Sequence, residues 1–161
     1  MGKFLILILF LFSASLVFVS CEEATCTDST AVNINISFYK QTSNTASAFD
    51  SLTVRGLNRT KDSLLYNRAK SIKKIALPLH ILVDSTGFEI DFFRSNSALT
   101  LQKDTVWFFH KNRPFYISPE CGCSVFATID TIKMTHHRIS QIRITKPEIT
   151  NLNEEHVIIL Y

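Results

Sequence analysis

Residues Cys123 to Met134 read CSVFATIDTIKM and form a long strand-like segment. Apolar residues recur in it at every second position, at Val125, Ala127 and Ile129, which is the pattern of a β-strand with one face turned towards a core. A polar break follows the segment, and residues 142–144 resume the alternation. The last third of the chain is therefore predicted to form two successive strands joined by a polar turn.

Working outward, the same alternation recurs in short segments along the rest of the chain. Val106–His110 is apolar on both faces and is predicted to be a central strand. Pro78 cannot donate to a ladder, so its strand is expected at a sheet edge or to end there. Asp62–Lys70 is expected to form a helical turn, and Asp84–Gly87 is expected to be a turn. The other predicted strands occupy residues 32–39, 51–56, 75–79, 88–92 and 157–161.

This organisation predicts an all-β fold. Many short strands joined by polar turns favour an antiparallel β-sandwich of roughly seven to nine strands. A calycin-like closed barrel is the alternative architecture. No helical stretch is long enough for the crossovers of a parallel α/β sheet. We expect residues 31–161 to form this single β domain.

The first residues predict where the protein goes. Lys3 is followed by a short apolar run, and the composition turns acidic directly after Cys21, which is the layout of a secretory signal. The segment Leu16–Cys21 resembles the lipobox of bacterial lipoproteins, which implies that residues 1–20 are a signal peptide and that Cys21 carries lipid. Residues 21–30 are then a short lipidated tether. The alternatives are a plain signal peptide with an incidental cysteine and a transmembrane anchor, although the apolar run is shorter than the roughly 20 residues that a span needs.

Three cysteines follow Cys21, namely Cys26, Cys121 and Cys123. Disulfides persist in the oxidising compartment that an exported protein reaches, and we expect a Cys26–Cys121 bond, with Cys123 free or competing for Cys26. Such a bond would hold the domain close to the lipid on Cys21, because the extended chain from there to Cys26 reaches at most roughly 17 Å. The alternative is that Cys121 and Cys123 are simply buried apolar residues.

The Cys-x-Cys pair has His136-His137 nearby in the sequence, a combination that could hold a metal ion. If residues 123–134 form one strand, however, its ends lie roughly 35 Å apart. A hairpin at the histidines then places them at the opposite end of the sheet from the cysteines. No metal site and no cofactor are therefore predicted, and the histidines are expected to be exposed in a turn. His110 has no partner that the sequence identifies.

Six of the seven aspartates are followed by Ser or Thr and then by an apolar residue or Thr. Asp and Ser side chains cap turns, which explains the pattern structurally. The pattern also resembles the acceptor site for protein O-glycosylation in the Bacteroidota. Ser29 and Ser51, expected in flexible segments, are the preferred sites, whereas Thr131 lies within a predicted strand. The O-glycosylation candidates are Ser29, Ser51, Ser63, Ser85 and Thr105.

Several short motifs occur along the chain, namely Cys21, Cys26, Leu77-Pro78-Leu79, Cys121-Gly122, Ile149-Thr150 and a strand that runs to the C-terminus. Taken together, they resemble an uncharacterised lipoprotein family of the Bacteroidota, a domain of unknown function. The resemblance covers essentially the whole chain and implies a place in the cell envelope, but no activity and no catalytic residues. Members tend to carry an aromatic residue after Cys121-Gly122, where this chain has Cys123.

The function that these features favour is an interaction or structural module, anchored in the outer membrane and contacting an unknown envelope protein or glycan. A small-molecule or lipid carrier in the periplasm is the alternative, with the Phe residues of the domain lining a lumen. An enzyme is not expected, because no nucleophile elbow, phosphate loop or zinc-protease helix is present in the sequence. A nucleic-acid partner is not expected either. Without Lys3 of the signal the chain has 16 basic and 14 acidic residues, from totals of 17 and 14, and these charges are scattered.

Overall fold

The computed structural model describes residues 25–27, 29–58, 63–93 and 102–161. The predicted signal peptide, residues 1–20, and the lipidation candidate Cys21 lie outside the described residues. The described part of the chain is all-β, as predicted; it contains no helix, and hence none long and apolar enough to cross a membrane. The strands are β1 (Asn33–Lys40), β2 (Thr45–Ala46), β3 (Phe49–Gly56), β4 (Ser63–Ile72), β5 (Lys74–Pro78), β6 (Ser85–Phe93), β7 (Gln102–Ser118), β8 (Gly122–Met134), β9 (Gln141–Ile144), β10 (Glu148–Ile149) and β11 (Val157–Leu160).

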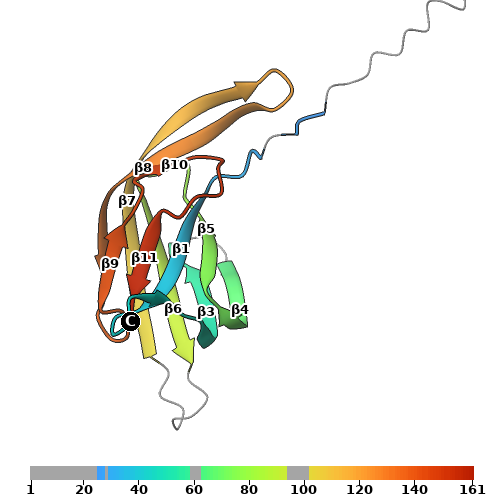
Figure 1. Ribbon diagram of the computed structural model, residues 1–161. Helices are drawn as coiled ribbons and strands as arrows, with labels where there is room; N and C mark the ends of the chain where they lie inside the picture. Colours follow the sequence, from blue (N-terminus) through green and yellow to red (C-terminus); the bar gives the residue numbers. More distant parts are fainter. Residues whose placement is uncertain (1–24, 28, 59–62, 94–101) are drawn as a thin grey trace, which may run out of the picture.

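The strands form two open sheets, which confirms the sandwich and not the barrel alternative (Figure 1). One sheet has the order β2-β1-β11-β9, with β5 also paired to β1, and the other has the order β10-β8-β7-β6-β3-β4. All pairs are antiparallel except β1 and β11, which run in parallel with Ile36 opposite Val157. The eleven described strands exceed the roughly seven to nine expected, partly because β2 and β10 are two-residue ladders too short to leave a sequence pattern.

The core lies between the two sheets and is filled by the apolar positions of the alternating strands. Phe88 and Phe108 meet edge to face, with their ring centroids 6.1 Å apart, and Phe38 meets Phe49 in the same way at 5.0 Å. Such edge-to-face contacts are favourable for aromatic rings. The largest fully buried apolar side chains are Phe38, Phe88, Phe108, Ile34, Ile36, Leu52, Leu77, Ile90, Ile139, Ile149 and Ile159.

Two local predictions are wrong. The helical turn expected at Asp62–Lys70 is strand β4 over its described part, and its register against β3 is irregular. Arg68 and Ser71 have positive φ angles of 46° and 55°, so the local backbone departs from a regular strand and the period-two pattern is lost. The turn expected at Asp84–Gly87 lies before Ser85 in the structure, and Ser85 is already the first residue of β6.

The β7–β8 hairpin extends well beyond the sheets as a two-stranded arm, here defined as residues 111–126 (Figure 1). The pairing of β6 with β7 ends at Phe109, and β8 pairs with β10 only at Ala127 and Thr128. On one face of the arm the rings of Phe115 and Phe126 stack at 4.3 Å. An isolated two-stranded ribbon is only marginally stable in water, so these contacts contribute to holding the arm in shape.

Candidate functional site

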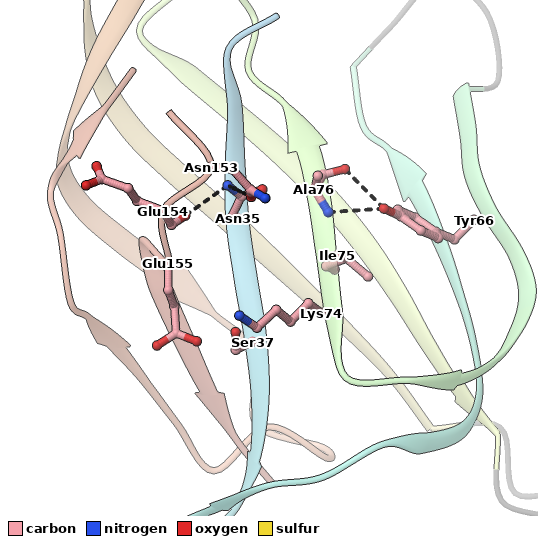
Figure 2. A pocket seen from close by; sticks show the side chains of 9 residues that line it. All are labelled: Asn35, Ser37, Tyr66, Lys74, Ile75, Ala76, Asn153, Glu154 and Glu155. Carbon is pink, nitrogen blue, oxygen red and sulfur yellow. Dashed lines mark hydrogen bonds between the residues drawn. The ribbon is translucent and has the colours of Figure 1, made fainter. Parts of the chain in front are cut away.

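A groove of about 350 Å³ lies over the outer face of β1 and β5 (Figure 2). It is open to solvent, and its lining combines polar and charged residues with Ile75 and Ala76. Its walls come from β1, β5, the side of β4 and the segment that precedes β11. The lining residues are Asn35, Ser37, Tyr66, Lys74, Ile75, Ala76, Asn153, Glu154 and Glu155.

The alternation of β1 places two polar side chains in this groove. Ile34, Ile36 and Phe38 are fully buried in the core, so Asn35 and Ser37 between them point to the opposite face. The Ser37 side chain is nevertheless buried, with the residue 1 % exposed, and no described group hydrogen-bonds its Oγ. A buried hydroxyl without a partner is costly in a folded protein.

The segment before β11 is fixed to β1 by Asn35. The Asn35 side-chain amide donates to Glu154 O at 2.9 Å and to Asn153 Oδ1 at 3.3 Å. Its backbone N–H donates to His156 Nδ1 at 3.0 Å, and the His156 N–H donates back to Asn35 O at 3.0 Å. Burial lowers the pKa of His156, which keeps the ring neutral and able to accept from Asn35. One wall of the groove is therefore rigidly built.

The opposite wall is closed by Tyr66 of β4. Its hydroxyl accepts from the backbone N–H of Ala76 at 3.1 Å and donates to the carbonyl of the same residue at 3.3 Å (Figure 2). The N–H and C=O groups of Ala76 lie on an edge of β5, and the backbone groups of an edge strand are otherwise left without hydrogen-bond partners. The phenol thus satisfies both backbone groups of Ala76 in place of a further strand.

Side chains of opposite charge, Lys74 and Glu155, face the groove but do not pair with each other within the described residues. Glu154 pairs with Lys146, but none of the ion pairs among the described residues includes Lys74 or Glu155. Figure 2 shows the Lys74 side chain lying over β1 near Ser37, with the Glu155 side chain on the side of β1 that faces away from β5. Together with the two amides, these groups suit a polar ligand that both donates and accepts hydrogen bonds.

Several buried polar side chains lie outside the groove, among them Asp104 and His110. The Asp104 carboxylate, 0 % exposed, accepts from the backbone N–H groups of His137, Arg138 and Ile139 at 2.6–2.9 Å and from Thr135 Oγ1 at 2.7 Å. Burial alone would raise the pKa of Asp104, but these hydrogen bonds lower it overall. Asp104 thus caps the polar loop between β8 and β9, in which His137 is exposed.

His110, which the sequence left without a partner, has two in the structure. Its Nε2 lies 2.9 Å from Thr86 Oγ1, and its Nδ1 lies 2.9 Å from Asn112 Oδ1. Burial lowers the pKa of His110. No group of three His, Cys, Asp or Glu side chains within the described ranges is placed to hold a metal ion.

The Cys26–Cys121 disulfide is present, with Cα atoms 4.8 Å apart, which confirms that prediction. Cys123 is a free, exposed thiol. The bond joins the segment that leads into β1 to the tip of the arm. A second contact, from Ser124 Oγ to Thr30 O at 2.9 Å, holds the same segment against the arm.

The O-glycosylation candidates differ in their surroundings. Ser29 is exposed and outside any strand, although the preceding Asp28 lies outside the described residues. Ser51 lies within β3, in agreement with the strand predicted at residues 51–56, so it lacks the flexible surroundings expected of a preferred site. Ser63 and Ser85 are the first residues of β4 and β6, and Thr105 lies within β7.

The fold and its groove define a class: an all-β sandwich with a polar surface cavity, a protruding arm and one disulfide. Within that class the chain belongs to the family of unknown function DUF6452, whose model matches residues 51–161. The match begins inside β3 and includes Cys121 but not Cys26. No curated protein and no solved structure matches the chain.

Proposed function

We propose that this protein is a lipoprotein of the bacterial cell envelope, anchored to the outer membrane through lipid on Cys21, that contacts an envelope protein or glycan. The lipobox-like sequence around Cys21 supports the anchor. The resemblance to a Bacteroidota lipoprotein family supports the same compartment, and the disulfide fits an oxidising environment.

The disulfide also explains how the module is presented. The chain from Cys21 to Cys26 spans at most roughly 17 Å, and Cys26 is bonded to Cys121 at the arm tip. The lipid therefore attaches the sandwich through its arm, and the body of the domain follows behind the arm. Such an arrangement suits a binding surface held close to the membrane.

The filled core favours an interaction module over a small-molecule or lipid carrier. A carrier needs an enclosed apolar cavity for its ligand, whereas the space between the sheets holds tightly buried Phe, Ile, Leu and Val side chains. The groove of about 350 Å³ lies on the surface and is lined mainly by polar groups. We therefore assign the groove as the contact site for a polar partner, such as a glycan or an extended peptide segment.

The anchor is tested by metabolic labelling with an alkyne fatty acid in the native host. The wild-type chain should incorporate the label, and Cys21→Ser should not. Labelling of Cys21→Ser at the wild-type level would contradict the anchor.

The contact site is tested by introducing a photo-crosslinking residue at Glu155. We expect a reproducible crosslinked partner that Lys74→Ala weakens by several-fold, since that ammonium lines the same groove. Lys70→Ala, an exposed lysine of β4 that does not line the groove, is the matched control and should leave the crosslink intact. Equal effects of the two alanine variants would exclude the groove as the contact site.

A further inference from the structure

The loop between β5 and β6 exposes three consecutive aliphatic side chains. Ile81, Leu82 and Val83 are 57 %, 83 % and 45 % exposed. A single exposed apolar residue is ordinary on a protein surface, but a contiguous group at the tip of a loop marks an interaction site. The exposed Leu82 in particular makes no contribution to the core that would explain a leucine there.

The backbone of this loop is hydrogen-bonded by polar side chains from within the protein. Asn112 Nδ2 donates to His80 O at 3.1 Å and to Val83 O at 3.0 Å. His80 Nδ1 accepts from the Leu82 N–H at 3.3 Å, and the His80 N–H donates to Thr86 Oγ1 at 2.8 Å. A loop whose backbone is satisfied in this way can enter apolar surroundings without leaving these groups unpaired.

The loop lies at the end of the sandwich where the N-terminal segment enters (Figure 1). Asn33, the first residue of β1, pairs with Pro78 at the end of β5, three residues before Ile81. Asn112, which holds the loop, lies at the base of the arm whose tip is bonded to Cys26. The anchor segment, the arm and the apolar loop therefore share one end of the molecule.

The arm adds an aromatic side chain on the side of the loop. Residues at every second position of a strand share a face, so Tyr116 lies on the same face of β7 as Asn112, the residue that contacts the loop. Tyr116 is 58 % exposed. Tyrosine is enriched at membrane–water interfaces, because its ring is apolar and its hydroxyl is polar.

We propose that Ile81, Leu82 and Val83 insert into the interfacial region of the bilayer that carries the lipid anchor, with Tyr116 at the headgroup level. This inference rests on the proposed lipid anchor. It makes the lipid and the loop two separate attachment points, so the domain has a defined orientation on the membrane. The arm from Lys111 to Ser118 spans roughly 23 Å at ~3.3 Å per residue, which leaves the loop within reach of the surface when the arm lies along it.

The first test measures depth in the full lipidated protein in phosphatidylethanolamine–phosphatidylglycerol vesicles. A nitroxide is attached to Leu82→Cys in a Cys123→Ser background, and its collisions with oxygen and with a water-soluble nickel chelate are compared by electron paramagnetic resonance. We expect the label at Leu82 to be accessible to oxygen and shielded from nickel. A label at Thr45→Cys, beside Lys40 at the other end of β1, should show the opposite. Equal nickel access at both positions in vesicle-bound protein would overturn the proposal.

The second test separates the loop from the anchor. The unlipidated Cys21→Ser chain should float weakly with the same vesicles, and Leu82→Ser in that chain should lower the partition coefficient about tenfold, as expected for loss of one leucine from an apolar phase. Failure of the wild-type chain to label with fatty acid would refute the anchor alone. No flotation of the Cys21→Ser chain, or no effect of Leu82→Ser, would refute insertion of the loop.

Discussion

Replacing Asp104 by Asn should destabilise the fold severely although the two side chains have nearly the same shape. The carboxylate is fully buried and accepts four hydrogen bonds from the segment that connects β8 to β9, namely residues 135–139. An amide keeps one accepting oxygen and turns an NH2 group towards the N–H donors on the other side. Two donors on that side, the backbone N–H groups of Arg138 and Ile139, lose their acceptor.

The magnitude follows from those two lost bonds. A hydrogen bond to a charged acceptor contributes about 1.5–3 kcal/mol, and a buried donor left unpaired costs a similar amount. Two such losses give a destabilisation of about 3–6 kcal/mol. Because a domain of this kind is stable by only about 5–15 kcal/mol, the variant should lose a large part of its stability.

Urea unfolding of the oxidised protein, followed by far-ultraviolet circular dichroism, measures this loss. With a denaturant slope of about 1–3 kcal/mol/M, the midpoint should fall by at least about 1 M. The matched control is Asp130→Asn, because Asp130 is also followed by Thr, but its side chain is 45 % exposed and pairs only with Lys111 at 3.6 Å. The control should change stability by less than about 1 kcal/mol. A midpoint for Asp104→Asn equal to that of the control would refute the reasoning.

Burial lowers the pKa of both His110 and His156, so below the ordinary histidine pKa of about 6.5 the unfolded chain binds protons that the folded state does not. The free energy of unfolding should therefore fall as the pH drops from 7.5 to 5.5. Urea midpoints at each pH measure this fall, and a pH profile that His156→Gln does not flatten would contradict it. Cys121→Ser opens a loop between cysteines 95 residues apart and should cost about 2–5 kcal/mol under oxidising conditions, with no further loss when reductant is added. Gly87→Ala places a Cβ 2.8 Å from three ring atoms of Trp107 and should cost about 1–3 kcal/mol; since the chain has a single Trp, its emission should shift as well, and an unchanged spectrum would exclude the contact.

The sequence predicts the fold wherever a strand keeps its period of two. β8 is predicted almost to the residue because Val125, Ala127 and Ile129 keep the alternation, which shifts phase only after Ile129, where the pairing with β7 is irregular. β4 is missed because the positive φ angles at Arg68 and Ser71 break that period, and the remaining composition imitates a helical turn. The turn predicted at Asp84–Gly87 is misplaced because glycine is typical of turns. In the structure Gly87 lies within β6, where the Trp107 ring covers it and leaves no room for a side chain.

The candidate groove is less predictable, because its contacts join distant parts of the chain. Alternation identifies Asn35 and Ser37 as outward-facing, but the partners of Asn35 lie 118 or more residues away and leave no local signal. Asp104 and Asp130 share the same Asp-Thr pattern, and burial alone distinguishes them. The disulfide is predictable, since few cysteines are available for pairing.

The bond between Cys26 and the arm connects the N-terminal segment to the domain by two covalent routes. One route follows the backbone from Cys26 to β1, and the other crosses through sulfur to Cys121 at the arm tip. A protease that cuts between Cys26 and Asn33 would therefore not release the domain until the disulfide is also reduced. Similarly, a pulling force applied N-terminal to Cys26 loads the arm as well as the first strand, so the two-stranded arm shares the mechanical load.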